Sequence, residues 1–142
     1  MSQEVSGLAS YLQPEDDGLL MRDSGQWTNV KLHYLQRYIE MFITRMRKQK
    51  WRALNYIDLL AGPGKCFIRE NKQIVLGSPL IALKAPHAFD GHYLVDLDSE
   101  NVKSLQTRCA ASSHFGRIRF YTGDCNHLVG YIVSDINATD SR

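Results

Sequence analysis

The sequence predicts an α/β fold built on a parallel sheet. Three apolar runs with strand character alternate with segments of helical periodicity, in the order strand, helix, strand, helix, strand, helix. This order favours parallel strands joined by right-handed crossovers, and hence a doubly wound sheet. The length of 142 residues and a hydrophobic content of 44% suit one globular domain with a substantial core.

The N-terminal part of the chain predicts an arm followed by a long helix. Residues 1–27 mix Gly, Ser, Asp and Glu with few apolar residues, so we expect a loosely ordered arm there and a domain over residues 28–142. From residue 28 onwards apolar side chains recur at helical spacing. They predict a helix over about residues 28–48, with Thr28 or Asn29 as its N-cap.

The middle of the chain predicts a strand, a hairpin and a short helix. Residues 54–60 are an apolar run of strand length, and residues 65–77 carry two β-prone pieces around a polar turn, which is typical of a small hairpin. Ser78 followed by Pro79 predicts a helix start, because a hydroxyl caps well and proline suits the first helical position.

The C-terminal part completes the alternation. Residues 92–97 and 117–122 are predicted strands, and residues 99–111 and about 126–136 are predicted helices. With the strand at 54–60 they give about three parallel strands, the second of which lies in the middle.

Composition excludes several classes of protein. The sequence contains no apolar run of the roughly 20 residues that span a bilayer, and its start lacks the pattern of a secretory signal. Cys66, Cys109 and Cys125 are odd in number and far apart, so they predict reduced thiols and neither a disulfide framework nor a zinc site. The five histidines show no metal-ligand spacing. We therefore expect a cytoplasmic protein without a membrane partner.

The charges are unevenly distributed. Residues 1–30 hold five acids and one base, whereas residues 31–52 hold seven bases against Glu40 alone. A basic helix can be the footprint of a nucleic acid, because neutralising phosphates releases counterions. The interpretation that the sequence favours is a solvated helix face.

The stretch YIDLLAGPGK indicates a ligand-binding turn. Asp58 lies near the end of a predicted strand, and Gly62 and Gly64 allow a tight turn that approaches a ligand closely. A plain strand-to-loop turn, with Asp58 as an acceptor for amides, is the alternative. Phe67 stands where the dinucleotide fingerprint has its third glycine, which argues against NAD.

Two further acids end the other predicted strands. Asp96 closes YLVDLD, where a carboxylate can accept both ribose hydroxyls, and Asp124 follows Gly123 where it can accept from an adenine amino group. Three strands that each end in an acid near a glycine or a turn favour a nucleoside pocket.

The motifs KLHYLQRYIEMF, YIDLLAGPGK, GSPLIAL, YLVDLD and GDCN occur in this order. Together they resemble the N-terminal half of the three-Cys-motif partner family, bacterial proteins with a methyltransferase-like domain. The resemblance covers about residues 31–136 and implies a Rossmann-like fold that binds S-adenosylmethionine. Asp58, Gly62 and Gly64 would lie by its methionine part, Asp96 by the ribose and Asp124 by the adenine. The candidate cofactor-binding residues are therefore Asp58, Ala61, Gly62, Gly64, Asp96 and Asp124.

The resemblance is to the cofactor half of such a domain. The sequence ends without an Asp-Pro-aromatic-Gly, Asn-Pro-Pro-Tyr-like or Pro-Cys motif, so no catalytic residue is assigned. We expect a partial methyltransferase-like protein that binds S-adenosylmethionine weakly and is inactive alone. The alternative is a non-enzymatic module. It would pair with another chain or a second copy through an exposed sheet edge, or bind nucleic acid through the basic helix at residues 31–52.

Overall fold

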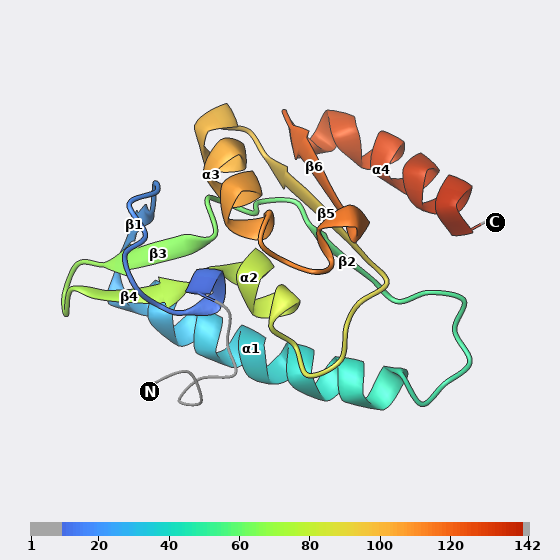
Figure 1. Ribbon diagram of the computed structural model, residues 1–142, viewed down its shortest axis with the longest axis horizontal. Coiled ribbons are helices and arrows are strands. Elements are labelled where there is room, and N and C mark those ends of the chain that lie inside the picture. The colour runs from blue at the N-terminus through green and yellow to red at the C-terminus, as the bar shows by residue number, and fades with distance from the viewer. Residues whose placement is uncertain (1–9, 141–142) are drawn as a thin grey trace.

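The computed structural model describes residues 10–140 and contains two three-stranded sheets (Figure 1). One sheet consists of β2 (Asn55–Asp58), β5 (Gly91–Asp96) and β6 (Ile118–Thr122), in the spatial order β2-β5-β6. Both pairings are parallel. The predicted α/β class, the parallel strands and the central position of the second strand are confirmed.

Helices cover both faces of this sheet. They are α1 (Gln26–Met46), α2 (Ser78–Leu83), α3 (Ser99–Cys109) and α4 (Cys125–Asp140), with short 3-10 turns at Ser10–Leu12 and Phe115–Arg117. Successive side chains of β5 point to opposite faces. Leu94 packs in the core with α1, α2 and α3, whereas Tyr93 and Val95 pack against Ile132 of α4. All six residues of β5 are buried, as expected for a central strand covered twice.

The second sheet consists of β1 (Arg22–Ser24), β3 (Lys65–Ile68) and β4 (Gln73–Leu76), in the order β1-β3-β4. β3 and β4 form the predicted antiparallel hairpin. β1 pairs parallel with β3, so the segment expected to be a loosely ordered arm contributes a strand. The part of that expected arm at residues 1–9 lies outside the described residues.

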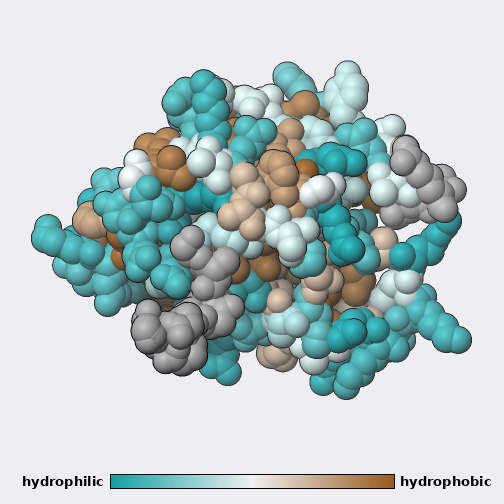
Figure 2. Space-filling model, in the orientation of Figure 1, coloured by the Kyte–Doolittle hydropathy of each residue, from teal (hydrophilic) through white to brown (hydrophobic). Residues whose placement is uncertain are grey.

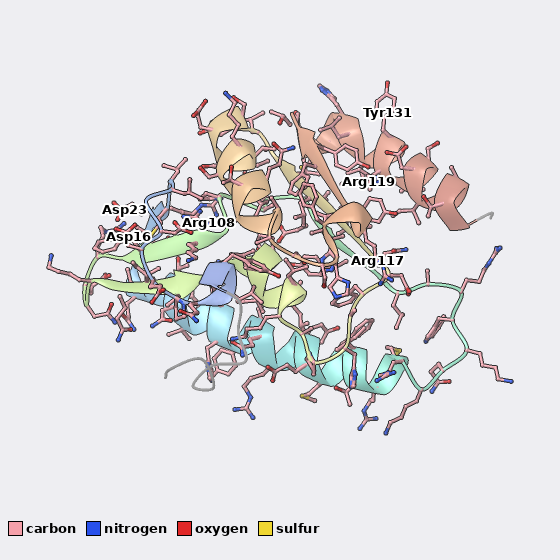
Figure 3. All side chains as sticks on the ribbon, in the orientation of Figure 1. Asp16, Asp23, Arg108, Arg117, Arg119 and Tyr131 are labelled. Atoms are coloured by element: carbon pink, nitrogen blue, oxygen red, sulfur yellow. The ribbon has the colours of Figure 1, made fainter. Side chains whose placement is uncertain are left out.

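Residues 15–24, which we call the N-terminal strap, are held by two buried cations, Arg108 and Lys65. The Arg108 guanidinium donates two bonds to the Asp17 carboxylate, at 2.8 and 2.7 Å, and one each to the backbone oxygens of Leu20 and Pro63, both at 2.7 Å. Figure 3 shows Arg108 reaching from α3 towards the strap. The ammonium of Lys65 donates to the Glu15 oxygen at 2.8 Å and lies 3.3 Å from Asp17. Three charges thus replace the apolar contacts that β1 lacks.

The helix starts differ from the sequence predictions by one or two residues. α1 begins at Gln26, and Gly25 in an extended conformation takes the N-cap position expected for Thr28 or Asn29. Gly77, also extended, takes the N-cap position of α2, and Ser78 lies within the first turn, where its hydroxyl donates to Asp58. Within the described part of the chain, every helix is too short or too polar for a bilayer span.

Candidate cofactor site at the glycine loop

The glycine loop, residues 59–64, leaves the carboxyl end of β2 and leads into β3. Gly62 and Gly64 have φ angles of +70° and +106°, where other residues are strained. A Cβ on Gly64 would lie 3.1 Å from Leu105, so this position is set by packing. A Cβ on Gly62 would meet the guanidinium of Arg22 at 2.9 Å. Gly62 therefore keeps open the space over the loop that a charged group occupies.

Asp58 stabilises the start of the glycine loop through hydrogen bonds that its carboxylate accepts. One carboxylate oxygen accepts from the Tyr56 hydroxyl at 2.9 Å and from the Ser78 hydroxyl, and the other accepts from the Leu60 amide at 3.2 Å. Burial, reinforced by the charge of Asp58 and the bond to it, raises the pKa of Tyr56. These contacts match the alternative in which Asp58 is an acceptor for its own turn.

Asp96 connects the glycine loop to the central strand. Its Oδ2 accepts from the Gly62 amide at 2.8 Å, and its Oδ1 accepts from the Asp98 amide at 2.9 Å and the Asn101 side chain at 3.0 Å. Burial opposes ionisation of this side chain. The three bonds and the nearby charge of Arg22 outweigh that effect, so the pKa of Asp96 is lowered. The carboxylate is ionised at neutral pH, and protein donors already form three hydrogen bonds to it.

This arrangement limits what Asp96 can offer a ligand. A carboxylate has about four lone-pair positions, and protein donors fill three of them here. The remaining position on Oδ2 is near Arg22, whose Nη2 atom lies 3.7 Å away. The expectation that Asp96 accepts the ribose hydroxyls stays a prediction, and in this arrangement one accepting position is open, with Arg22 beside it.

The three acids at the strand ends lie at the same, carboxyl-terminal end of the sheet, because parallel strands all end on one side. The Ala61 amide donates to the Val95 oxygen at 2.8 Å, and the Gly123 amide donates to the Asp96 oxygen at 3.0 Å. These bonds bring the ends of β2, β5 and β6 together. Asp124 is exposed, and its carboxylate accepts from the Asn126 amide at 2.9 Å, which makes it the N-terminal cap of α4.

A cavity of about 670 Å³ lies between the glycine loop and α1. Its walls include Arg22 and Ser78, and α1 contributes Lys31, Tyr34 and Tyr38. The volume is in the range of small-molecule sites, about 300–1,000 Å³. Asp96 and Asp124 are absent from the described lining, so the cavity touches only the loop side of the candidate site.

Two exposed leucines flank the acids, Leu60 in the wall of the cavity and Leu97 outside its described lining. Leu60 and Leu97 are 72% and 75% exposed, and they follow the ends of β2 and β5. Exposed leucines at two adjacent strand ends offer apolar surface near the Asp96 carboxylate. Such a surface suits an aromatic base.

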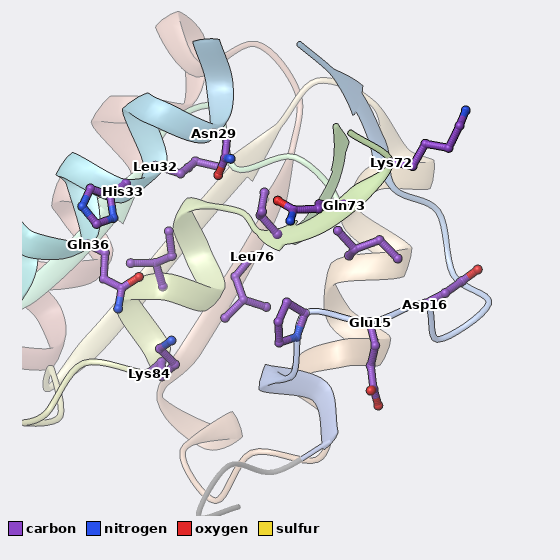
Figure 4. A pocket seen from close by; sticks show the side chains of 14 residues that line it. Glu15, Asp16, Asn29, Leu32, His33, Gln36, Lys72, Gln73, Leu76 and Lys84 are labelled. Atoms are coloured by element: carbon purple, nitrogen blue, oxygen red, sulfur yellow. The ribbon is translucent and has the colours of Figure 1, made fainter. Parts of the chain in front are cut away.

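A second cavity, of about 690 Å³, lies between α1 and β4. Figure 4 shows Asn29 and His33 of α1 facing Gln73 and Leu76 of β4 across it, with Glu15 at its rim. None of its described lining residues belongs to the glycine loop. We therefore place the candidate site at the smaller cavity.

Sequence reasoning missed three residues of this site. Ser78 was expected only as a cap, Asn101 lies five residues after Asp96 on the next helix, and Arg22 lies in the expected arm. A signal existed for Arg22, because it is the only base among residues 1–30. Nothing in the local pattern of Asn101 distinguishes it from other polar helix residues.

Comparison with known proteins adds no family or relative. No protein-family model matches the sequence, and no curated protein matches it. Among the described residues, no group of three or more His, Cys, Asp or Glu side chains is arranged to hold a metal ion. All three cysteines are free thiols, and burial raises the pKa of Cys109 to about 12.

Proposed function

We propose that the glycine loop binds a nucleoside cofactor of the S-adenosylmethionine type on a Rossmann-like sheet. The observation that carries the proposal is the 2.8 Å bond from the Gly62 amide to Asp96, which joins the loop to the end of the neighbouring parallel strand. Ligands of doubly wound sheets bind at this edge. The resemblance of YIDLLAGPGK and YLVDLD to a methyltransferase-like family gives the cofactor its proposed identity.

Each part of the cofactor has a proposed place. The adenine lies on the exposed Leu97, and one ribose hydroxyl donates to the open position on Asp96. The methionine part crosses Gly62 towards the cavity, where its carboxylate meets the guanidinium of Arg22. Arg22 is 47% exposed, so it is free to exchange Asp96 for a ligand carboxylate.

Isothermal titration with S-adenosylhomocysteine tests the proposal. Gly62→Ala puts a methyl group where the ligand crosses the loop, and we expect affinity to fall about tenfold or more. The matched control is Gly18→Ala. Gly18 also has a positive φ, of +81°, but a Cβ there meets nothing within 4 Å. Both variants carry the backbone cost of about 1–2 kcal/mol, so a selective loss in Gly62→Ala reports on the space over the loop, which the ligand would share with the Arg22 guanidinium.

Absence of heat with the wild-type protein at millimolar ligand would refute the cofactor proposal. Asp96→Asn is a less clean test than Gly62→Ala. Asp96 also accepts from Gly62, Asp98 and Asn101, so its replacement loosens the loop and lowers the melting temperature together with any affinity.

The edge of β2 supports a second proposal, pairing with another copy of the chain. β2 lies at the end of the order β2-β5-β6, and within residues 10–140 it pairs only with β5. Ile57 in this strand is 42% exposed. An unpaired strand edge with an apolar residue favours association.

A further inference from the structure

The exposed side of α1 carries aromatic and basic side chains, and one methionine, in a single line. They recur at intervals of four, three, four, three and four residues and comprise Trp27, Lys31, Tyr34, Tyr38, Met41 and Arg45. We call them the aromatic–basic stripe. Because a helix turns once per 3.6 residues, this spacing keeps all six on one side of α1. The buried residues Ile39 and Ile43 mark a different side.

The three rings and the methionine of the stripe are unusually exposed. Trp27 is 70% exposed, and Tyr34, Tyr38 and Met41 are 65–67% exposed. Their aromatic contacts are local, between Tyr34 and His33 and between Tyr38 and Phe42, both on the same helix. An amphipathic surface helix normally turns polar residues to water. Packing within the described chain therefore does not account for these rings.

The charges around the stripe are uncompensated. Seven bases lie in residues 31–52, all are exposed, and none forms a salt bridge to any residue of the described chain. The one acid of the segment, Glu40, accepts from Gln36 at 3.1 Å. In the orientation of Figure 2, hydrophilic residues gather at the lower right, over the C-terminal part of α1 and the segment that follows it. The surface carries excess positive charge.

We propose that the aromatic–basic stripe binds single-stranded nucleic acid. The exposed rings stack on unpaired nucleobases. Basic side chains such as Lys31 and Arg45 neutralise the phosphates between these nucleobases. A duplex would leave the rings unused because its bases are already stacked. The proposal is independent of the cofactor proposal and replaces the solvated-face interpretation that the sequence alone favours.

The dimensions of the stripe fit such a ligand. At about 1.5 Å of rise per residue, the distance from Trp27 to Arg45 is about 27 Å. Stacked nucleotides repeat every ~3.4 Å, so the stripe holds at most about eight of them. Single-strand sites of ~4–16 nucleotides are known for other folds. Lys31, Tyr34 and Tyr38 also line the cavity beside the glycine loop, so a bound strand passes the mouth of that cavity.

Fluorescence anisotropy with labelled 12-nucleotide oligo-dT and oligo-U tests the proposal. We expect binding at 50 mM salt that weakens with a log–log slope of about −1.4, since the two basic side chains of the stripe contact phosphates at ~0.7 each. Tyr38→Ala lowers affinity about tenfold with an unchanged slope, because each stacked base is worth ~1–3 kcal/mol. Lys31→Gln lowers affinity and makes the slope less steep.

Tyr131→Ala is the matched control. Tyr131 is 69% exposed, as exposed as Tyr38, but lies on α4 at the opposite side of the molecule from α1 (Figure 3). Its replacement leaves affinity unchanged. A second readout is the fluorescence of Trp27 in a Trp51→Phe background, which stacking quenches. Trp27 and Trp51 are the two tryptophans of the chain.

Three results would overturn the proposal. The first is no anisotropy change with either oligonucleotide at 50 mM salt. The second is equal affinity of wild type and Tyr38→Ala, which would mean that rings do not contribute. The third is displacement of oligo-dT by poly-glutamate as effectively as by unlabelled oligo-dT, which would assign the surface to an acidic protein partner.

Discussion

Different interactions stabilise the two sheets of this protein. β2, β5 and β6 are neighbours joined by helices, and they are fixed by apolar side chains on both faces of β5. In the other sheet β1 has only three residues, and the ion pair between the buried Arg108 and the partly exposed Asp17 ties its segment to the core. Apolar burial is spread over many contacts, whereas the strap depends on a few polar ones, of which Asp17 accepts the bonds of Arg108 and lies against Lys65. The second sheet is therefore the one that a single substitution can open.

Asp17→Asn should break the strap and have the largest effect. The change leaves Lys65 and Arg108, which are fully buried, without their carboxylate partner. Removing one partner of a buried pair costs about 3–5 kcal/mol, and partial exposure of Asp17 places the expected loss near the lower value. Denaturant unfolding followed by circular dichroism measures it.

The control for Asp17→Asn is Asp23→Asn in the same strap. Asp23 faces solvent, and its ion pair with Arg69 at 3.6 Å is exposed on both sides. This variant should change the free energy of unfolding by less than about 0.5 kcal/mol. Equal losses in the two variants would contradict the assignment of the strap's stability to the buried pair.

The parallel sheet should show its own sensitivity, to acid. Burial, with a smaller contribution from His114, lowers the pKa of His92 to about 4, and its Nδ1 atom has no partner in the described structure. The unfolded state, with a pKa near 6.5, binds the proton more readily. The contribution of the neutral His92 to the free energy of unfolding is therefore fully present above pH 6.5. It is lost as the pH falls from 6.5 to 4, by at most about 3 kcal/mol.

Thermal melts between pH 7.5 and 4 measure this effect. His92→Phe should remove the pH dependence in that window, whereas the exposed His33→Asn should keep it. The window differs from that of Asp17, whose lowered pKa contributes stability that is lost only as pH falls below about 3.8. A slope between pH 6.5 and 4 that persists in His92→Phe would contradict the account.

Arg22→Met should separate the strap's part in binding from its part in folding. Arg22 is half-exposed, so its removal should change stability little. If it holds the ligand carboxylate, the affinity for S-adenosylhomocysteine falls about tenfold. The affinity for methylthioadenosine, which lacks that carboxylate, stays the same. Calorimetric titration of both ligands decides, and equal losses for the two would remove Arg22 from the carboxylate site.

Ile57→Lys should have the smallest effect on folding. Ile57 lies in the edge strand β2 and is partly exposed, so the free energy of unfolding should change by less than about 0.5 kcal/mol. A charged residue on a strand edge opposes pairing between chains. Light scattering of wild type and variant over a range of concentrations tests this, and a wild type that stays monomeric would refute pairing through β2.

The predictability of this fold follows the same division. The parallel sheet and the hairpin could be predicted because their strands are continuous apolar runs bounded by turn signals. β1 could not, because Arg22, Asp23 and Ser24 carry no apolar residue and pair with a strand that begins at Lys65. Its stability comes from contacts between residues distant in sequence, which local patterns do not record.

The site was predictable to a similar extent. The glycines and the acids could be chosen because each follows a predicted strand, and parallel pairing brings strand ends to one edge. The competition of Arg22 for Asp96 could not be foreseen, nor the filling of three acceptor positions by the protein itself. Likewise, periodicity placed α1, but the exposure of Tyr34 and Tyr38 depends on what the rest of the chain leaves uncovered.

The bond from Gly62 to Asp96 gives the protein a built-in spectroscopic probe. An amide proton held by a carboxylate resonates downfield and exchanges slowly with solvent, and both properties depend on the charge and occupancy of the acceptor. The Gly62 amide is buried and donates to Asp96 at 2.8 Å. Its single peak in an amide correlation spectrum therefore reports, without any label at the sheet edge, whether the end of β5 is ionised, free or engaged by a ligand.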